Sequence, residues 1–227
     1  MNAFTVSARW KEIYPGAVVG VLALENLVNA RQNAALDARK TALESELRSR
    51  YADSDRATLR EIPTLRAYHA YYKRFKKSYH VQLQLESLIH KGKSIPRVNV
   101  LVEAMFMAEL EDHLLTAGHD LDLVRQPVGI DVAQGSEIYT RINGQEQRLK
   151  PGDMMISDAD SVLSSIIYGP DRRTAIHLGT TRVLYTAYAP AGIGEELVGK
   201  HLENIGDLVL LASPSATVTM LEAFSAD

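Results

Sequence analysis

The chain opens with two apolar runs of strand length. Residues 4–8 (FTVSA) and 17–24 (AVVGVLAL) favour extended backbone, and the turn sequence YPG lies between them. We therefore expect two strands at the start of the fold.

Helix formers dominate the residues that follow. Residues 30–50 are rich in them, and Leu36, Leu43 and Leu47 give a narrow apolar stripe. A second helix is expected from Asp55, a suitable N-cap, and Pro63 should interrupt or restart it because proline cannot donate the helical hydrogen bond. A further amphipathic helix is expected to end at Lys91 and Gly92, before the basic turn KSIPR.

The most apolar helix is predicted from Asn99 to about His113. Its apolar residues fall on nearly every side, so we expect it to be central and buried. The sequence GHDLD (118–122) follows and is interpreted as an acidic turn.

After Asp122 short apolar runs alternate with turn signals such as QG, INGQ, KPGD and SDAD, which is typical of antiparallel strands. A last helix is expected over about 194–212. The pattern predicts one α+β domain over residues 1–227, helix-rich in its N-terminal half and β-rich in its C-terminal half.

Composition narrows the class of protein. The 227 residues are 46% hydrophobic and 23% charged, as in soluble globular proteins. No apolar run is long enough to span a bilayer, and the first residues lack the pattern of a secretory signal. Cysteine is absent, which excludes disulfides and thiolate chemistry. We expect a cytoplasmic protein without membrane contact, DNA binding, metal or cofactor.

Charge is distributed unevenly. Residues 1–100 carry 17 Lys and Arg against 9 Asp and Glu, whereas residues 101–227 carry 8 against 19. A polyanion would have to bind the basic half, but two oppositely charged layers of one fold would also attract each other. Two basic clusters are candidates for RNA contact: Lys73, Arg74, Lys76 and Lys77, and then Lys91, Lys93 and Arg97. Aromatic residues interleave with the first cluster and either stack on bases or belong to the core.

The order of these segments resembles a known family. The string from Ser78 to Asp122 is similar to the B3/B4 domain of the phenylalanyl-tRNA synthetase beta subunit, and closest to freestanding versions with the pattern EALL-R-GK-LP-IN-LVD…GYDLD. YPGAVVGVLALENLVN and LKPGDMMISDADSVLSSIIYG resemble its opening strand and its later strand pair. The resemblance implies a layered fold of mostly antiparallel sheets flanked by helices.

In the synthetase this domain hydrolyses tyrosine wrongly attached to the tRNA for phenylalanine. Its editing pattern, V-D-x-T-N followed by H-A-F-D, places the threonine, asparagine and histidine on Met105, Phe106 and Ala117. Its acidic residue falls on Glu103, its closing aspartate on Asp120, and a late glutamate near Tyr185. These departures count against tyrosine editing by the same mechanism and predict a more apolar pocket.

Polar residues of the matching segments are candidates for such a pocket. Asn99 and Glu103 lie on one helix face and either contribute catalytic groups or act as a cap and an ion-pair partner. His119 and Asp120 either supply a base or stabilise a turn. The resemblance adds candidate substrate-binding residues: Met105, Asp158, Ser165, Tyr168 and Thr181.

The resemblance implies an editing-like domain that binds tRNA and hydrolyses a mischarged aminoacyl-tRNA ester. The chain has no aminoacylation core, Gly-rich phosphate loop or G-x-S-x-G motif. Two alternatives stay open, namely an RNA-binding module without catalysis and a hydrolase or sensor for an amino-acid-like small molecule.

Overall fold

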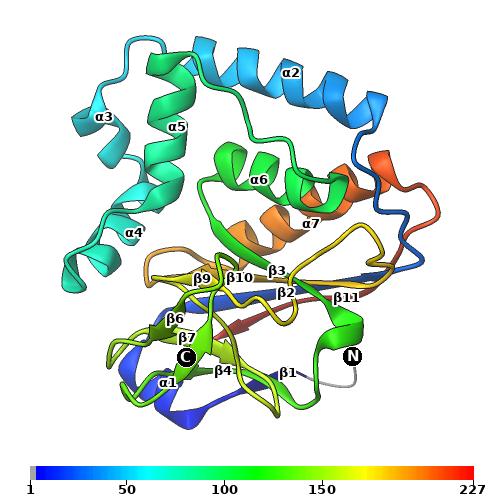
Figure 1. Ribbon diagram of the computed structural model, residues 1–227. Helices are drawn as coiled ribbons and strands as arrows, with labels where there is room; N and C mark the ends of the chain where they lie inside the picture. The colour runs from blue at the N-terminus through cyan, green and yellow to red at the C-terminus, as the bar shows by residue number, and fades with distance from the viewer. Residues whose placement is uncertain (1–3) are drawn as a thin grey trace.

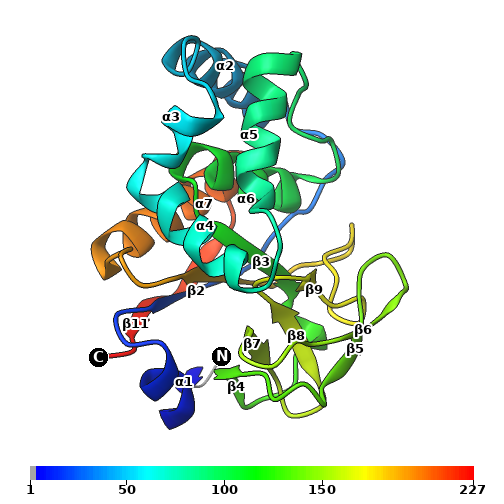
Figure 2. The same cartoon turned by 90° about the vertical axis from the view of Figure 1, so that its left-hand side faces the viewer.

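The computed structural model describes residues 4–227 and places a layer of helices over two sheets (Figures 1 and 2). The central sheet has the order β11-β2-β10-β3 and is antiparallel throughout. Its strands are β2 (Val18–Glu25), β3 (Leu115–Asp120), β10 (Val183–Ala189) and β11 (Thr217–Ser225). Strand β3 therefore ends the sheet on one side, which leaves its outer edge unpaired within this sheet.

A second sheet lies beneath the central sheet, with the order β1-β4-β7-β8-β9. Its strands are β1 (Phe4–Val6), β4 (Val128–Val132), β7 (Met154–Ser157), β8 (Val162–Ser165) and β9 (Gly169–Pro170). The pair β1–β4 is parallel and the other pairs are antiparallel. A small ribbon of β5 (Ile138–Thr140) and β6 (Glu146–Arg148) projects beside it.

Helices cover the upper face of the central sheet (Figure 1). They are α2 (Ala34–Arg50), α3 (Arg56–Arg60), α4 (Pro63–Arg74), α5 (His80–Lys91), α6 (Val100–Asp112) and α7 (Glu195–Ala212). Helix α1 (Ala8–Ile13) lies on the opposite side, and a 3₁₀ turn, η1 (Leu121–Leu123), follows β3. These elements confirm the predicted α+β class.

Helix α6 is the central helix, as its composition predicted. Asn99 caps it by accepting the Val102 N–H at 3.1 Å, and His113 ends it in the left-handed conformation with φ 61°. Glu103 is buried on the α2 side, where its carboxylate pairs with Lys40. The helix also packs against α5, α7 and β3, so it connects the helical layer to the edge of the central sheet.

The structure corrects three expectations from the sequence. GHDLD is not simply a turn, because Gly118, His119 and Asp120 end strand β3. A Cβ at Gly118 would lie 2.8 Å from a methyl group of Ile176, so glycine permits close packing there. The expected strand 4–8 ends at Val6, because Ser7 caps helix α1 by accepting the Trp10 N–H.

Strand β11 is the third correction, since no strand was expected after the last helix. Its alternating polar and apolar residues are only partly buried, and it gains its place by pairing with β2. Within residues 4–227 no helix is long and apolar enough to cross a membrane.

Candidate functional site

A cavity of about 460 Å³ opens at the free edge of β3, between α6 and the β8–β9 turn. We call it the main cavity. Because it lies at a strand edge, residues from both faces of β3 reach it. It is lined by His80, Gln84, Val98, Val102, Met105, Phe106, Glu109, Leu115, Thr116, Ala117, Gly118, Ile142, Ser165, Gly169, Pro170, Ala175, Ile176 and Tyr188.

The walls of the main cavity are mostly aliphatic and aromatic. Among the lining residues the polar side chains come from His80, Gln84, Glu109, Thr116, Ser165 and Tyr188. The hydroxyl of Tyr188 is bonded to Ser164, and Ser165 accepts the Tyr168 N–H at 3.1 Å. A concave apolar surface with a few placed polar groups is the usual form of a small-ligand site.

Glu109 is the buried carboxyl group of this wall. Only 2% of the residue is exposed, and its Oε1 accepts the backbone N–H of Thr116 at 2.8 Å. Burial raises the pKa of Glu109 from 4.5 to about 8, while the Thr116 hydrogen bond lowers it. Glu109 therefore carries a proton at neutral pH, and its carboxyl group can donate a hydrogen bond as well as accept one.

The hydroxyl of Thr116 belongs to a series of hydrogen bonds that continues to His201 and Asp112. Its hydroxyl lies 2.7 Å from Nε2 of His201 on α7, and Nδ1 of the same ring lies 2.8 Å from the carboxylate of Asp112. Asn204 donates to the same Asp112 oxygen at 2.9 Å. A partly exposed carboxylate, a completely buried imidazole and a buried hydroxyl therefore follow one another, and the hydroxyl belongs to a residue of the cavity wall.

His80 begins α5 and lines the main cavity. Burial lowers the pKa of its imidazole to about 4, so this ring is neutral at physiological pH. Its Nδ1 lies 3.3 Å from the hydroxyl of Tyr72. A neutral ring in an apolar wall suits contact with an uncharged part of a ligand.

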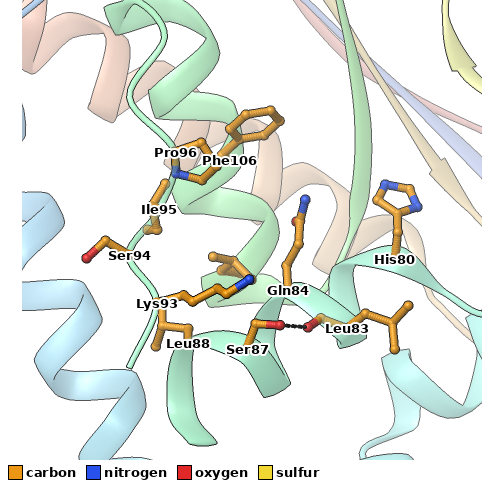
Figure 3. A pocket seen from close by; sticks show the side chains of 11 residues that line it. His80, Leu83, Gln84, Ser87, Leu88, Lys93, Ser94, Ile95, Pro96 and Phe106 are labelled. Carbon is orange, nitrogen blue, oxygen red and sulfur yellow. Dashed lines mark hydrogen bonds between the residues drawn. The ribbon is translucent and has the colours of Figure 1, made fainter. Parts of the chain in front are cut away.

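A smaller cavity of about 330 Å³ adjoins the main cavity, and we call it the side cavity (Figure 3). The two share His80, Gln84 and Phe106 as lining residues. Its other walls come from α5, from Leu110 on α6, and from the segment after α5, which contributes Lys93 and Pro96 (Figure 3). The side cavity thus combines apolar walls with one exposed cation.

Three of the positions that the family resemblance assigned to editing meet at the main cavity, whereas Glu103, Asp120 and Tyr185 are not among its lining residues. Met105, Phe106 and Ala117 all line it, although they stand where the resemblance places Thr, Asn and His. Ser165, a predicted substrate-binding residue, lines it too. The lining therefore has apolar side chains at the three positions where the resemblance places polar ones.

The predicted catalytic pair on α6 lies outside this lining. Asn99 is engaged as the helix cap. The carboxylate of Glu103 binds Lys40 and accepts the Val98 N–H at 2.9 Å. These contacts account for the burial of both residues, and a catalytic role for either stays a prediction.

His119 and Asp120 lie at the far end of β3, also outside the cavity lining. Nδ1 of His119 is 2.8 Å from the Thr174 hydroxyl, while its buried Nε2 has no hydrogen-bond partner in the described structure. Asp120 accepts from Thr180 at 2.6 Å and lies 3.2 Å from His177. The two side chains thus hold together the segments that flank the end of the sheet.

The remaining predicted substrate-binding residues lie elsewhere. Asp158 organises a turn by accepting the Arg125 N–H and an Arg173 guanidinium hydrogen, each at 2.8 Å. Tyr168 is partly buried and lies under Lys77, and Thr181 is exposed before β10. None of these three residues lines the main cavity.

The two basic clusters are exposed, and the aromatics between them are not. The first cluster lies at the surface where α4 leads into α5 and consists of Lys73, Arg74, Lys76 and Lys77. The second cluster lies at the surface where α5 ends and consists of Lys91, Lys93 and Arg97. Tyr71, Tyr72, Phe75 and Tyr79 are buried in the core. The sequence alternative in which these aromatics stack on RNA bases is therefore wrong, because the core already covers their rings.

Sequence reasoning missed Glu109, Thr116, His201 and His80. Glu109 carried a signal, because it is a charged residue between Ala108 and Leu110 in a mostly apolar helix. Thr116 and His201 carried none, because they are far apart in the chain and only the packing of α7 against α6 joins them. Within residues 4–227 no group of His, Asp and Glu is arranged to hold a metal ion.

Comparison with known proteins places this site in a family. The model of the B3/4 domain matches residues 65–195. A phenylalanine–tRNA ligase beta subunit from Anaeromyxobacter dehalogenans (strain 2CP-C) is 36% identical over 90 residues, which cover 35% of this chain and 11% of that subunit.

A crystal structure of an N-terminal fragment of the phenylalanyl-tRNA synthetase beta subunit from Pyrococcus horikoshii superposes with a TM-score of 0.49 and 12% identity, covering 96% of this chain and 52% of that chain. The chain thus spans about half of this fragment and a small part of the bacterial subunit. The family model matches more than half of the chain, including α5, α6 and β3, which build the main cavity. The chain therefore belongs to the B3/4 domain family.

Proposed function

We propose that this protein binds the aminoacyl end of a charged tRNA and hydrolyses the ester. The observation that carries the proposal is the main cavity, an apolar pocket at the positions where the family resemblance places editing residues. The similarity to a phenylalanine–tRNA ligase beta subunit supports tRNA as the class of substrate.

The cavity favours an apolar amino acid. Its volume of about 460 Å³ lies within the range of small-ligand pockets, and its walls are largely apolar. Each apolar group that leaves water for such a wall contributes about 25 cal/mol per Å² of buried surface. Met105 and Phe106 extend this apolar lining, so we infer that a hydrophobic side chain is preferred over a charged one.

Exposed lysines lie before α5 and after it. Lys77 precedes the cavity residue His80 by three positions, and Lys93 lines the side cavity. Arg97 is already paired with Asp37 at 3.0 Å. We assign contact with the tRNA phosphates to Lys73, Lys76, Lys77 and Lys93, since phosphate binding requires clustered basic side chains.

We assign the chemical group that assists hydrolysis to the wall of the main cavity. An aminoacyl ester is activated, so positioning and a hydrogen-bond donor for the developing oxyanion supply much of the acceleration. The protonated carboxyl group of Glu109 is such a donor, in an apolar site where hydrogen bonds to a charge are strong.

The test is a deacylation assay with a panel of mischarged tRNAs, run beside tRNA binding at two salt concentrations. We expect loss of ester from tRNA that carries a hydrophobic amino acid, and binding that weakens at the higher salt concentration. Salt-sensitive binding without ester loss would instead indicate an RNA-binding module. If the protein neither binds charged tRNA nor hydrolyses the ester, the proposal is overturned, and a small free ligand is indicated for the cavity.

A further inference from the structure

We propose that Thr116 is the nucleophile of this hydrolysis, with His201 as its general base and Asp112 as the group that orients His201. This inference rests on the proposed function for its natural substrate. The arrangement itself rests on two distances, 2.7 Å from the Thr116 hydroxyl to Nε2 and 2.8 Å from Nδ1 to the Asp112 carboxylate.

The hydrogen bonds fix the direction in which the proton can move. An ionised carboxylate only accepts, so Nδ1 of His201 must carry the hydrogen that Asp112 receives. Nε2 of the neutral ring is then an acceptor, and the Thr116 hydroxyl donates to it. Asn204 donates to the same carboxylate oxygen at 2.9 Å and holds it in place. These contacts are the ones that a general base requires, with one ring nitrogen facing a hydroxyl and the other a carboxylate.

Each member of the chain comes from a different element. Asp112 is the last residue of α6, Thr116 is the second residue of β3, and His201 lies within α7. Helix α7 packs against α6, which holds the imidazole between the other two groups. Only 4% of Thr116 is exposed, and of the three residues only Thr116 lines the main cavity.

The residues around Thr116 fit the needs of acyl transfer. Met105 and Ala117 supply no hydroxyl or imidazole at the positions where the resemblance places them, and among the β3 residues that line the cavity only Thr116 carries a hydroxyl. The carboxyl group of Glu109 accepts the Thr116 N–H and lies in the same wall. It is the donor available to an oxyanion formed next to Thr116.

The reaction divides into two balanced steps. In the first, the Thr116 oxygen bonds to the ester carbonyl carbon, its proton passes to Nε2 of His201, and the bond from that carbon to the ribose oxygen breaks. The ribose oxygen takes the proton from His201 and leaves as the tRNA hydroxyl. In the second, water gives a proton to Nε2 and its hydroxyl adds to the acyl carbon. The bond from that carbon to the Thr116 oxygen then breaks, and Nε2 returns the proton to this oxygen, which releases the amino acid and restores the Thr116 hydroxyl.

The test uses N-acetyl-phenylalanine p-nitrophenyl ester, an activated ester that needs no tRNA. We expect release of nitrophenol in an initial burst and an acyl group on Thr116, located by peptide mass spectrometry of the full-length protein. Thr116→Val should lose both signals, and Thr116→Ser should regain them because it restores the hydroxyl. Asp112→Asn should slow acylation by about 10⁴-fold, the cost of the wrong imidazole tautomer in such triads.

Thr186 supplies a matched control. It lies on the neighbouring strand β10, its hydroxyl is buried without a partner in the described structure, and it does not line the main cavity. Thr186→Val should keep the burst and the adduct. Circular dichroism and thermal melting identify which variants are folded, and the Asp112→Asn result stands if Thr116→Val fails to fold.

The outcomes separate this inference from the proposed function. A folded wild-type protein without an adduct at residue 116, or a Thr116→Val variant with the wild-type burst, overturns the nucleophile. If Thr116→Val still removes the amino acid from charged tRNA, the proposed function holds and the assignment of Thr116 as the nucleophile is overturned. If the activated ester acylates Thr116 but charged tRNA stays intact, Thr116 is confirmed as a nucleophile and the proposed deacylation of tRNA is overturned.

Discussion

Glu109 on α6 and Thr116 on β3 are joined by a hydrogen bond of 2.8 Å, from the Thr116 N–H to the Glu109 carboxyl oxygen. The chain reverses between them at His113, whose left-handed backbone ends the helix. This single bond therefore ties the central helix to the edge of the sheet and shapes one wall of the main cavity.

The raised pKa of Glu109 predicts a dependence of stability on pH. A carboxyl group whose pKa is about 8 when folded and 4.5 when unfolded holds its proton more tightly in the folded state. Its stabilising effect is complete below about pH 4.5 and is lost as the pH rises through 8, with a slope of up to about 1.4 kcal/mol per pH unit. Urea denaturation between pH 5 and pH 8 measures the free energy of unfolding.

The variant Glu109→Gln should have a shallower profile over the same range, because the amide does not titrate. Asp153, whose pKa burial raises to about 7, contributes to the profile of both proteins, so the difference between them isolates Glu109. Identical profiles for the two proteins would contradict the prediction.

The ion pair between Lys40 and Glu103 should stabilise the contact of α2 with α6. Both side chains are buried, so Lys40→Met leaves an uncompensated carboxylate and should cost about 3–5 kcal/mol of unfolding free energy. The double variant Lys40→Met with Glu103→Leu should recover much of that loss, because two apolar groups then face each other. Equal losses in the single and double variants would show that the buried charge is not the cause.

Filling the main cavity should block the substrate without unfolding the protein. Val102 lines the cavity and is only partly buried, so Val102→Trp places its added volume in the ligand space. We expect kcat/KM for deacylation to fall by at least tenfold, about 1.4 kcal/mol, with an unchanged melting temperature. Val218→Trp, at an exposed position on β11, is the control. Unimpaired deacylation by Val102→Trp would place the substrate elsewhere.

Charge reversal at Lys76 and Lys77 should weaken tRNA binding in a salt-dependent way. Each lost phosphate contact should reduce the slope of log K against log salt concentration by about 0.7–0.9. Lys200→Glu, at an exposed position on α7, should leave the slope unchanged. Filter binding at several salt concentrations supplies the slopes, and equal slopes for all proteins would exclude the cluster from the tRNA interface.

The elements that local sequence determines were predictable. Helix α6 followed from its apolar composition and its Asn99 cap, and β2 from one continuous apolar run. Strand β3 was not predictable, because Gly118 and Asp120 have low strand propensity. Only pairing with β10 and burial overcome that preference. Local propensity cannot report such a tertiary effect.

The site divides in the same way. Met105 and Ser165 were placed near the pocket because the resemblance follows the order of segments along the chain. The contact of Thr116 with His201 depends on how α7 lies across α6, and no spacing in the sequence encodes it. The buried contacts of Glu103 and Asp158 show the converse, since polar residues in matching segments also serve the scaffold.

The position of β2 has a consequence for synthesis of the protein. Strand β2 is made early, but both of its neighbours, β10 and β11, come from the last part of the described chain (Figure 1). An emerging nascent chain therefore carries an apolar strand with two unpaired edges until residues 183–189 have left the ribosome, and with one unpaired edge until residues 217–225 have followed. Exposed apolar edges of this kind promote aggregation. The central sheet therefore cannot be completed until residues 217–225 are available to pair with β2.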